Sequence, residues 1–144
     1  MSTQNSSSAL APESRAAVLI EALPYIRKFA NKVVVVKYGG NALAGATESD
    51  ALALFAEDIV LMRLVGLKPV VVHGGGPQIN AELKSRNIES TFVNGYRFTT
   101  DEIFEVVDEV LSKVVGPEVA NNLLLAGVKA QAISGKQSEV IFAE

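Results

Sequence analysis

The sequence predicts an α/β protein with a mainly parallel sheet that is sandwiched between helices. Two β-branched runs, Val33 to Tyr38 and Pro69 to His73, have the continuous apolar character of strands that a parallel sheet buries on both faces. A glycine turn and then a helical pattern follow each run, which is the order that crossover connections on such a sheet require. The 144 residues are enough for one domain with its own core.

The composition excludes several classes of protein. Hydrophobic residues make up 49% and charged residues 20% of the chain, as in ordinary globular proteins. No apolar run approaches the roughly 20 residues of a membrane helix, and a net charge of −3 provides no basic surface for nucleic acid. We therefore expect neither a membrane nor a nucleic acid as partner. The lack of cysteine excludes disulfides, and the single histidine, His73, argues against a histidine-rich metal site, so we assign no metal ligands.

The first 30 residues divide into two segments. Residues 1–14 are rich in Ser and Ala and contain no Lys or Arg, unlike a secretory signal or an Arg-rich transit peptide. We interpret them as a disordered tail of an intracellular protein. In residues 15–30, apolar side chains recur at helical spacing, and Pro24 predicts either a kink or a division into two short helices.

Residues 31–144 contain the sheet and its helices. The helix between the two strands is expected to begin at Ser49 or Asp50 as its cap and to end at Gly66. Its predicted buried stripe consists of Leu52, Phe55, Ile59 and Met62. Pro77 suits the first position of the next helix, which should run to about Arg86.

The pattern changes after residue 90. Asn94-Gly95 is a strong type I′ hairpin signal between aromatic and β-branched residues. Thr99 and Glu102 have the spacing of a capping box and predict a helix through about Val114. Further elements are expected as a helix over Pro117 to Ala126 and strands over Val128 to Ile133 and Glu139 to Phe142, around a turn at Ser134-Gly135-Lys136.

The two glycine turns are the main indication of chemistry. They follow the carboxyl ends of parallel strands, where ligands of open α/β sheets bind. Without β-carbons, Gly39-Gly40 and Gly74-Gly75-Gly76 let backbone N–H groups approach an anion closely. The second turn also opens a helix, whose unpaired N–H groups favour negative charge. Two such turns in one crevice predict a phosphate site; the alternative is that they are only tight strand-to-helix turns.

Two cations are candidate functional residues, Lys37 beside the first glycine turn and Arg97 just after the hairpin turn. Lys37 ends an otherwise apolar strand, where a buried charge is unfavourable unless it is paired or serves a site. Phosphoryl transfer needs positive charge on the transferring oxygens, so Lys37 is the best catalytic candidate; the alternative is a lysine that reaches solvent. Arg97 could grip a carboxylate through two parallel hydrogen bonds, although its position alone favours a solvent-exposed arginine. For His73, an orienting hydrogen bond is favoured over metal binding or acid–base work.

Three motifs resemble those of the N-acetylglutamate kinases in the amino-acid kinase family. They are VVVVKYGGNAL at Val33 to Leu43, VVVHGGGPQIN at Val70 to Asn80 and NGYRFT at Asn94 to Thr99. Their order and spacing match, and the resemblance runs from about Val18 to the last residue. The K-x-G-G, HGGGP and NG-x-R motifs are specific in combination, whereas any one of them alone is not.

The resemblance implies an activity and a role for each matching residue. Enzymes of this family phosphorylate the γ-carboxylate of N-acetyl-L-glutamate with ATP, and Mg²⁺ accompanies the ATP. Lys37 matches the lysine that stabilises the transition state, and Gly39 and Gly40 match the turn near the transferring phosphoryl group. Gly75 and Gly76 match glycines that contact the substrate, and Arg97 matches the arginine that binds its α-carboxylate.

The helical pattern of residues 15–30 resembles the extra helix of arginine-inhibited, hexameric members. The resemblance therefore implies an assembly helix, a homo-oligomer built as a trimer of dimers, and arginine as an inhibitor. Some photosynthetic members also bind the PII signalling protein, and we expect a cytoplasmic protein, or a plastid one in a photosynthetic eukaryote.

Two departures from the family pattern leave alternatives open. Gln137-Ser138 stands where the family turn usually reads Asp-Gly. Family members are also roughly twice as long, so residues 31–144 correspond to an incomplete, substrate-binding lobe without the carboxyl-terminal ATP lobe, and the fragment alone is expected to be inactive. The alternatives are the arginine-sensing kinase-like domain of an N-acetylglutamate synthase and a short, non-catalytic regulatory subunit.

Overall fold

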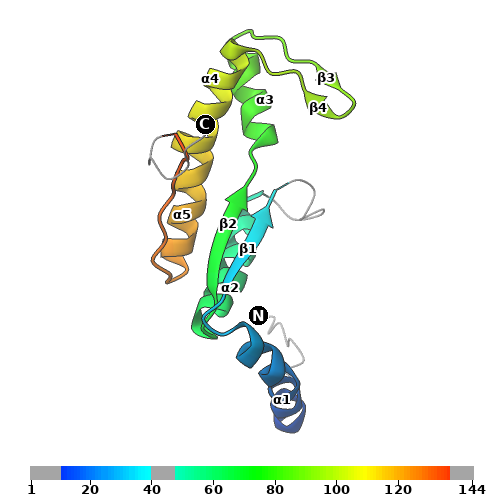
Figure 1. Cartoon of the computed structure of the whole chain (residues 1–144), viewed down its shortest axis with the longest axis vertical. Helices are drawn as coiled ribbons and strands as arrows, with labels where there is room; N and C mark the ends of the chain where they lie inside the picture. Colours follow the sequence, from blue (N-terminus) through cyan, green and yellow to red (C-terminus); the bar gives the residue numbers. More distant parts are fainter. Residues whose placement is uncertain (1–10, 40–47, 137–144) are drawn as a thin grey trace, which may run out of the picture.

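The computed structural model describes residues 11–39 and 48–136, so the predicted strand Glu139 to Phe142 lies outside the described residues. Figure 1 shows an elongated molecule with the sheet in the middle, a hairpin at one end and a separate helix at the other. In chain order the elements are α1 (Pro12–Phe29), β1 (Val33–Tyr38), α2 (Glu48–Leu64), β2 (Lys68–His73), α3 (Gly76–Ser85), β3 (Phe92–Val93), β4 (Tyr96–Arg97), α4 (Asp101–Glu109), the π-helix η1 (Val110–Val115) and α5 (Gly116–Leu125).

Helix α1 is one continuous helix of 18 residues with Pro24 inside it, so the alternative of two short helices is wrong. It begins at Pro12, a residue whose fixed φ suits the first helical turn. Residues 12–14, which we had placed in the disordered tail, are therefore helical. None of the residues in α1 is buried, and in Figure 1 the helix projects away from the sheet.

The two predicted strands pair in parallel, in a register that runs from Val33 opposite Lys68 to Tyr38 opposite His73. Helices α2, α3, α4, η1 and α5 pack into one core with this sheet, which confirms an α/β fold with a parallel sheet flanked by helices. The β3–β4 hairpin is antiparallel. Asn94 and Gly95 have φ values of 51° and 83°, as the two central residues of a type I′ turn require.

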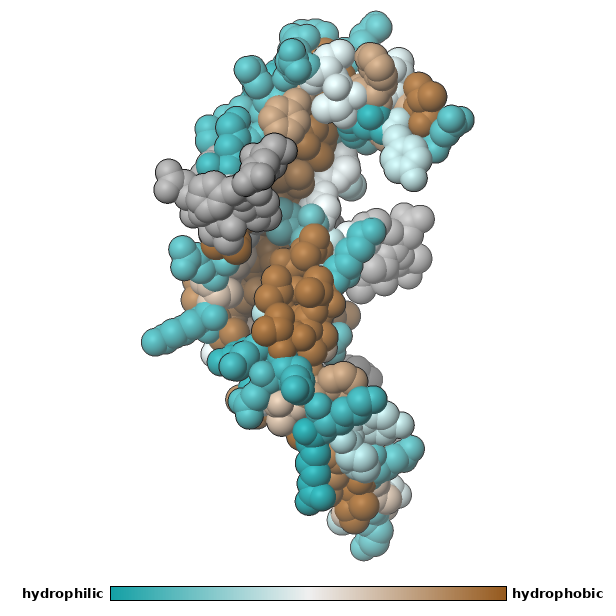
Figure 2. Space-filling model, viewed as in Figure 1, coloured by the Kyte–Doolittle hydropathy of each residue, from teal (hydrophilic) through white to brown (hydrophobic). Residues whose placement is uncertain are grey.

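The two faces of the parallel sheet differ. Val36, Tyr38 and Val71 pack against the core, while the opposite face exposes the four residues Val33, Val35, Val70 and Val72, each by 45–67%. Figure 2 shows these valines as an apolar patch over β1 and β2. Our expectation that both faces are buried was therefore wrong for the described residues, because their helices contribute to a core on one face only.

Helix α2 confirms the predicted stripe. Leu52 and Ile59 are buried, and Phe55 and Met62 pack against the same core. The helix starts at Glu48, so the two residues expected as caps lie inside its first turn. At its end, Gly66 has φ 94° and its N–H donates to Arg63 O at 3.0 Å, as in a glycine-terminated helix.

Helices α4 and α5 are joined through η1 into one long helical run (Figure 1). The cap is Thr100, whose side chain accepts a hydrogen bond from Ile103 N, so the expected Thr99 cap was wrong by one residue. The two predicted helices are present, but they are not separate. Pro117 lacks the N–H that would bond to Lys113 O, and its ring crowds that carbonyl, which gives a physical reason for a widened turn just before it.

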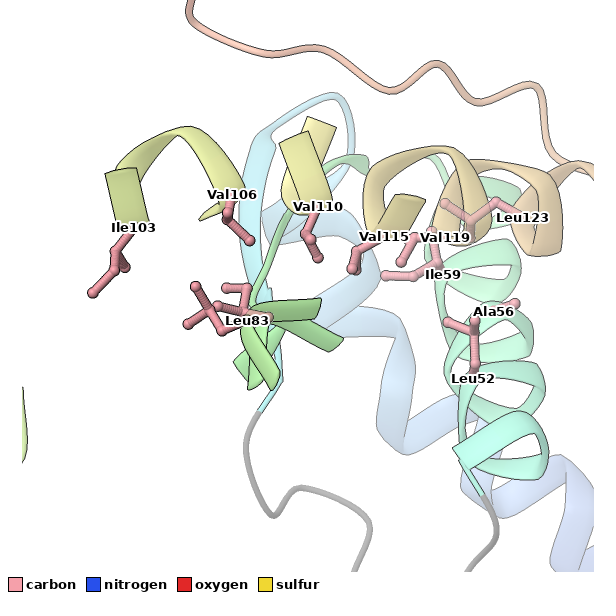
Figure 3. Packing of buried hydrophobic residues seen from close by; sticks show 11 residues of the cluster. Leu52, Ala56, Ile59, Leu83, Ile103, Val106, Val110, Val115, Val119 and Leu123 are labelled. Atoms are coloured by element: carbon pink, nitrogen blue, oxygen red, sulfur yellow. The ribbon is translucent and has the colours of Figure 1, made fainter. Parts of the chain in front are cut away.

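The core lies between α2, α3 and the long α4–η1–α5 run. Figure 3 shows Val106, Val110, Val115 and Val119 following one another along this run, with Leu83 on α3 and Ile59 on α2. Leu83 and Val106 are the largest side chains that are fully buried. Residues of α2, before the second glycine turn, and of α3, after it, both belong to this core.

Residues 128–133 form no strand, which contradicts our prediction. Their alternating pattern suits a strand, but a strand also needs a neighbour for its hydrogen bonds, and β2 pairs only with β1 among the described residues. The segment instead runs beside α5 (Figure 1). The turn expected at Gly135-Lys136 is present, and Lys136 Nζ lies 3.4 Å from Asp108 Oδ2.

Candidate functional site

The two glycine turns lie against each other at the carboxyl ends of β1 and β2. The Gly74 N–H donates a hydrogen bond to Tyr38 O at 2.9 Å. A β-carbon on Gly39 would lie 3.2 Å from Gly74 N, and Gly39 has φ 145°, a conformation that other residues rarely adopt. A side chain at position 39 would therefore separate the turns. Gly40, the second glycine of the first turn, lies outside the described residues.

The second turn leads directly into α3. Gly75 is the N-cap residue and Gly76 is the first helical residue, so Pro77 is the second and the helix begins one residue earlier than the sequence predicts. The N–H groups at the start of a helix have no partner within the helix and can bind an anion. A β-carbon on Gly76 would meet no described atom within 4 Å, so the structure leaves space beside this backbone.

Lys37 is the penultimate residue of β1 and lies opposite Val72 in the parallel register. It is exposed, on the same sheet face as Val33 and Val35. Its ammonium group is therefore accessible to a ligand near the first glycine turn, two residues further along the chain. The exposed position is also what the alternative, a lysine that reaches solvent, requires.

Arg97 is held against α3. Its Nη2 donates to Asn80 Oδ1 at 2.6 Å, its Nη1 donates to Ser90 Oγ, and its guanidinium lies 4.7 Å from the centre of the Phe92 ring. Asn80 is one helical turn after Gly76 and so shares a face of α3 with it. Arg97 is thus partly buried and oriented, not a freely solvated side chain.

His73 joins the second glycine turn to the long helical run. Its Nδ1 lies 3.1 Å from Gly74 O, a hydrogen bond that requires the proton to be on Nδ1. Its Nε2 lies 3.2 Å from where a β-carbon of Gly116 would be. The histidine is therefore engaged at the turn, as we expected for an orienting role.

Sequence reasoning missed Asn80 and Ser90, which hold the Arg97 guanidinium. Asn80 carried a usable signal, because a polar residue four positions after a helix-opening glycine lies on the same face. Ser90 carried none, since it meets Arg97 only through the fold of the hairpin.

Other features of the described residues lie away from the turns. A groove of about 440 Å³ between β2, α2, α5 and residues 128–133 includes His73 and Gly116 but none of the glycines of the two turns. Within residues 11–39 and 48–136, no three His, Cys, Asp or Glu side chains gather as metal ligands. None of the described helices is both long and apolar enough to cross a membrane.

Curated relatives and solved structures provide independent comparisons. The acetylglutamate kinase of Petrotoga mobilis is 48% identical over 131 residues, which cover 91% of this chain and 43% of that protein. The acetylglutamate kinase of Azoarcus sp. is 45% identical over 144 residues, which cover 100% of this chain and 47% of that protein. The chain thus spans less than half the length of these relatives.

A solved N-acetylglutamate synthase from Neisseria gonorrhoeae, complexed with coenzyme A and N-acetyl-glutamate, has a TM-score of 0.54 with this chain. The two are 22% identical over 77% of this chain and 24% of that chain, so this likeness concerns the fold alone. The sequence profile of the amino acid kinase family matches residues 32–144, which include both glycine turns, Lys37 and Arg97. The chain belongs to the amino acid kinase family.

Proposed function

We propose that this chain is the acceptor-binding part of an enzyme that phosphorylates the γ-carboxylate of N-acetyl-L-glutamate with ATP. The contact between the two glycine turns, through Gly74 N–H to Tyr38 O, is the observation that carries the proposal. This contact places the backbone that follows Lys37 next to the turn that leads into α3. The 45–48% identity to acetylglutamate kinases supports the choice of acceptor.

The reaction suits a site built of backbone N–H groups and cations. A γ-carboxylate with an ordinary pKa of about 4.3 is already ionised at neutral pH, so no base has to remove a proton. One carboxylate oxygen attacks the γ-phosphorus of ATP, the bond from that phosphorus to the β,γ-bridging oxygen breaks, and ADP leaves with the electron pair. The protein then has to align the reactants and stabilise negative charge on the transferring oxygens.

The proposal assigns a role to each candidate residue. Lys37 stabilises charge on the transferring phosphoryl group, and Gly39 and Gly40 let that group approach the backbone. Gly75 and Gly76 donate N–H groups to the acceptor. Arg97 binds the α-carboxylate. Its guanidinium group carries five N–H donors, and Asn80 and Ser90 accept hydrogen bonds from only some of them.

ATP and Mg²⁺ are expected as substrate and companion ion of this reaction. Mg²⁺ is usually held by one or two carboxylates together with phosphate oxygens, not by a protein cage. Among the described residues, no group of three or more His, Cys, Asp or Glu side chains could hold it. The proposal therefore assigns no residue of this chain to the ion, and Lys37 and the helix terminus act on the phosphoryl and acceptor oxygens directly.

Gly76→Ala tests the proposal without disturbing the fold. A β-carbon there meets no described atom within 4 Å, and alanine is the better helix former, so the variant should fold normally. If the acceptor sits on this backbone, the new methyl group should weaken N-acetyl-L-glutamate binding by at least ~10-fold, as calorimetry on the purified chain would measure. Asn121→Ala, an exposed change on α5, is the control. Equal affinity of Gly76→Ala and the unsubstituted chain would refute the proposed site.

Assembly and regulation belong to the same proposal. We infer that α1 joins dimers into a hexamer, because the helix has no buried residue and exposes apolar side chains at the positions 18, 19, 20, 23, 25 and 29. Arginine as inhibitor, PII as partner, and a cytoplasmic or plastid location follow from the resemblance alone. The synthase alternative rests on a 22% identical fold and is less favoured than the kinase.

A further inference from the structure

Gly75 differs from Gly39 in the reason why a side chain is excluded at its position. Its φ of −174° is extended backbone that any residue adopts, so conformation does not demand glycine there. A β-carbon on Gly75 would, however, lie 2.8 Å from Leu111 Cδ2 and 3.1 Å from Val115 Cγ2. Position 75 therefore has no room for a side chain, because side chains of η1 pack directly onto its backbone.

The junction between η1 and α5, at Gly116, lies near the turn at a second point. The closing hydrogen bond of η1 runs from Gly116 N–H to Leu111 O, five residues back, which marks the widened turn. A β-carbon on Gly116 would lie 3.2 Å from His73 Nε2 and 3.0 Å from Leu111 O. Of the residues on either side of Gly74, Gly75 thus lies against η1 and His73 lies near Gly116, the residue that follows η1. π-helical turns of this kind are frequent at functional sites.

We propose that η1 positions the second glycine turn, with Leu111 as the residue that holds the Gly75 backbone so that the N–H groups of Gly75 and Gly76 share one direction. The proposal deepens the function proposed above and rests on it for the identity of the acceptor. Leu111 touches no reactant and is a positioning residue. Val115, which is 5% exposed, faces the same backbone as Leu111 and also belongs to the core, so it connects η1 to that core.

This role predicts a local loss of order when Leu111 is truncated. In Leu111→Ala, Gly75 loses the nearer of its two neighbours on η1 and keeps Val115, while Ile79 N still donates to Gly75 O. NMR order parameters of the Gly75 and Gly76 amides should fall from about 0.85 toward 0.6 or below. Leu111→Met, which conserves volume, should keep them near the original value.

Leu123→Ala is the matched control, because Leu123 is a buried leucine of the same core on α5, away from the turn. Both truncations should lower the melting temperature by several degrees. Only Leu111→Ala should loosen the two glycine amides. If both variants loosen them equally, or neither does, η1 is ordinary core and the proposal is wrong.

A paired substitution tests the contact itself. Gly75→Ala should weaken N-acetyl-L-glutamate binding at least ~10-fold, because the new methyl group pushes the turn away from η1. Adding Leu111→Ala frees that space and should recover most of the affinity and the melting temperature. Effects that simply add in the double variant would overturn the contact. If the unsubstituted chain does not bind the acceptor, the proposed function fails, while the order parameters still decide whether η1 positions the turn.

Discussion

At the scale of single residues, the candidate site combines accessible and oriented cations. Lys37 lies exposed at a strand end, whereas Arg97 is fixed by Asn80, Ser90 and the Phe92 ring. This difference suits their proposed roles. A lysine that follows charge as it develops benefits from a flexible stem, and an arginine that reads a carboxylate benefits from a fixed fork.

Lys37→Met removes the charge and retains most of the apolar stem. In a full-length protein that contains this sequence, kcat should fall by at least ~100-fold, which is comparable with the loss of one donor that stabilises transition-state charge. Steady-state kinetics with N-acetyl-L-glutamate and ATP would measure this, and circular dichroism would verify the fold. A folded variant with near-normal kcat would remove Lys37 from the mechanism.

Arg97→Ala removes the proposed α-carboxylate ligand. Substrate affinity should weaken by roughly 2–4 kcal/mol, because a charge-assisted bidentate contact is lost. Arg97→Lys should recover little of this, since an ammonium group cannot reproduce the planar fork. Calorimetric titration with N-acetyl-L-glutamate tests both variants, and unchanged affinity in a folded Arg97→Ala protein would exclude the role.

At the scale of elements, α1 is separated from the core. Deleting the first thirty residues of a full-length protein should reduce a hexamer to dimers and weaken inhibition by arginine, because the exposed apolar side chains of α1 would lose their partners. Sedimentation velocity would show the change in size. An intact hexamer after deletion would reject the role of α1 in assembly.

Helices α3 and α4 are linked at their ends by a charged cluster. Arg86 Nη2 lies 2.7 Å from Glu82 Oε1 and 2.8 Å from Glu109 Oε2. The hydrogen bonds from Arg86 and then Lys113 lower the pKa of Glu109 below its ordinary value of 4.5. The same cluster raises the pKa of Arg86, first through Glu109, but arginine remains charged in any case.

The contribution of Glu109 to the free energy of unfolding should therefore depend on pH. Because the folded-state pKa is lowered, this contribution is complete above the ordinary value of 4.5 and is lost as the pH falls through the folded-state pKa. The effect should be small, since the groups are exposed. Arg86→Gln should reduce the change in melting temperature between neutral pH and about pH 3, while Lys84→Gln should leave that change as it is. Identical pH profiles for both variants would contradict the coupling.

At the scale of the whole molecule, the described residues provide the proposed acceptor site and one lysine near it. In-line transfer also needs charge stabilised on the leaving oxygens and a held nucleotide. Among the described residues the second glycine turn carries no lysine, and Lys136, in the turn at Gly135-Lys136, lies 3.4 Å from Asp108 Oδ2 and is paired with it. We therefore expect the 144-residue chain alone to show no turnover in an ADP-release assay with N-acetyl-L-glutamate, ATP and Mg²⁺. Substrate-dependent turnover near ~1 s⁻¹ would contradict this.

The local patterns of the sequence determined most elements of this protein. The run from Val33 to Tyr38 is β1 to the residue, the Asn94-Gly95 turn is type I′, and the stripe of α2 is the one that the spacing predicts. These features depend on interactions within a few residues, such as steric limits on φ and the period of a helix, and such interactions are readable from the chain.

Tertiary structure decided the rest. Residues 128–133 have a strand pattern but no strand, since pairing depends on a distant neighbour. The open valine face depends on which helices cover the sheet, and the hold of Asn80 and Ser90 on Arg97 depends on how the hairpin meets α3. The widened turn at η1, and with it the contact between Leu111 and Gly75, likewise arises from packing between segments that are far apart in the chain. Long-range contacts of this kind leave no periodic signal in a sequence.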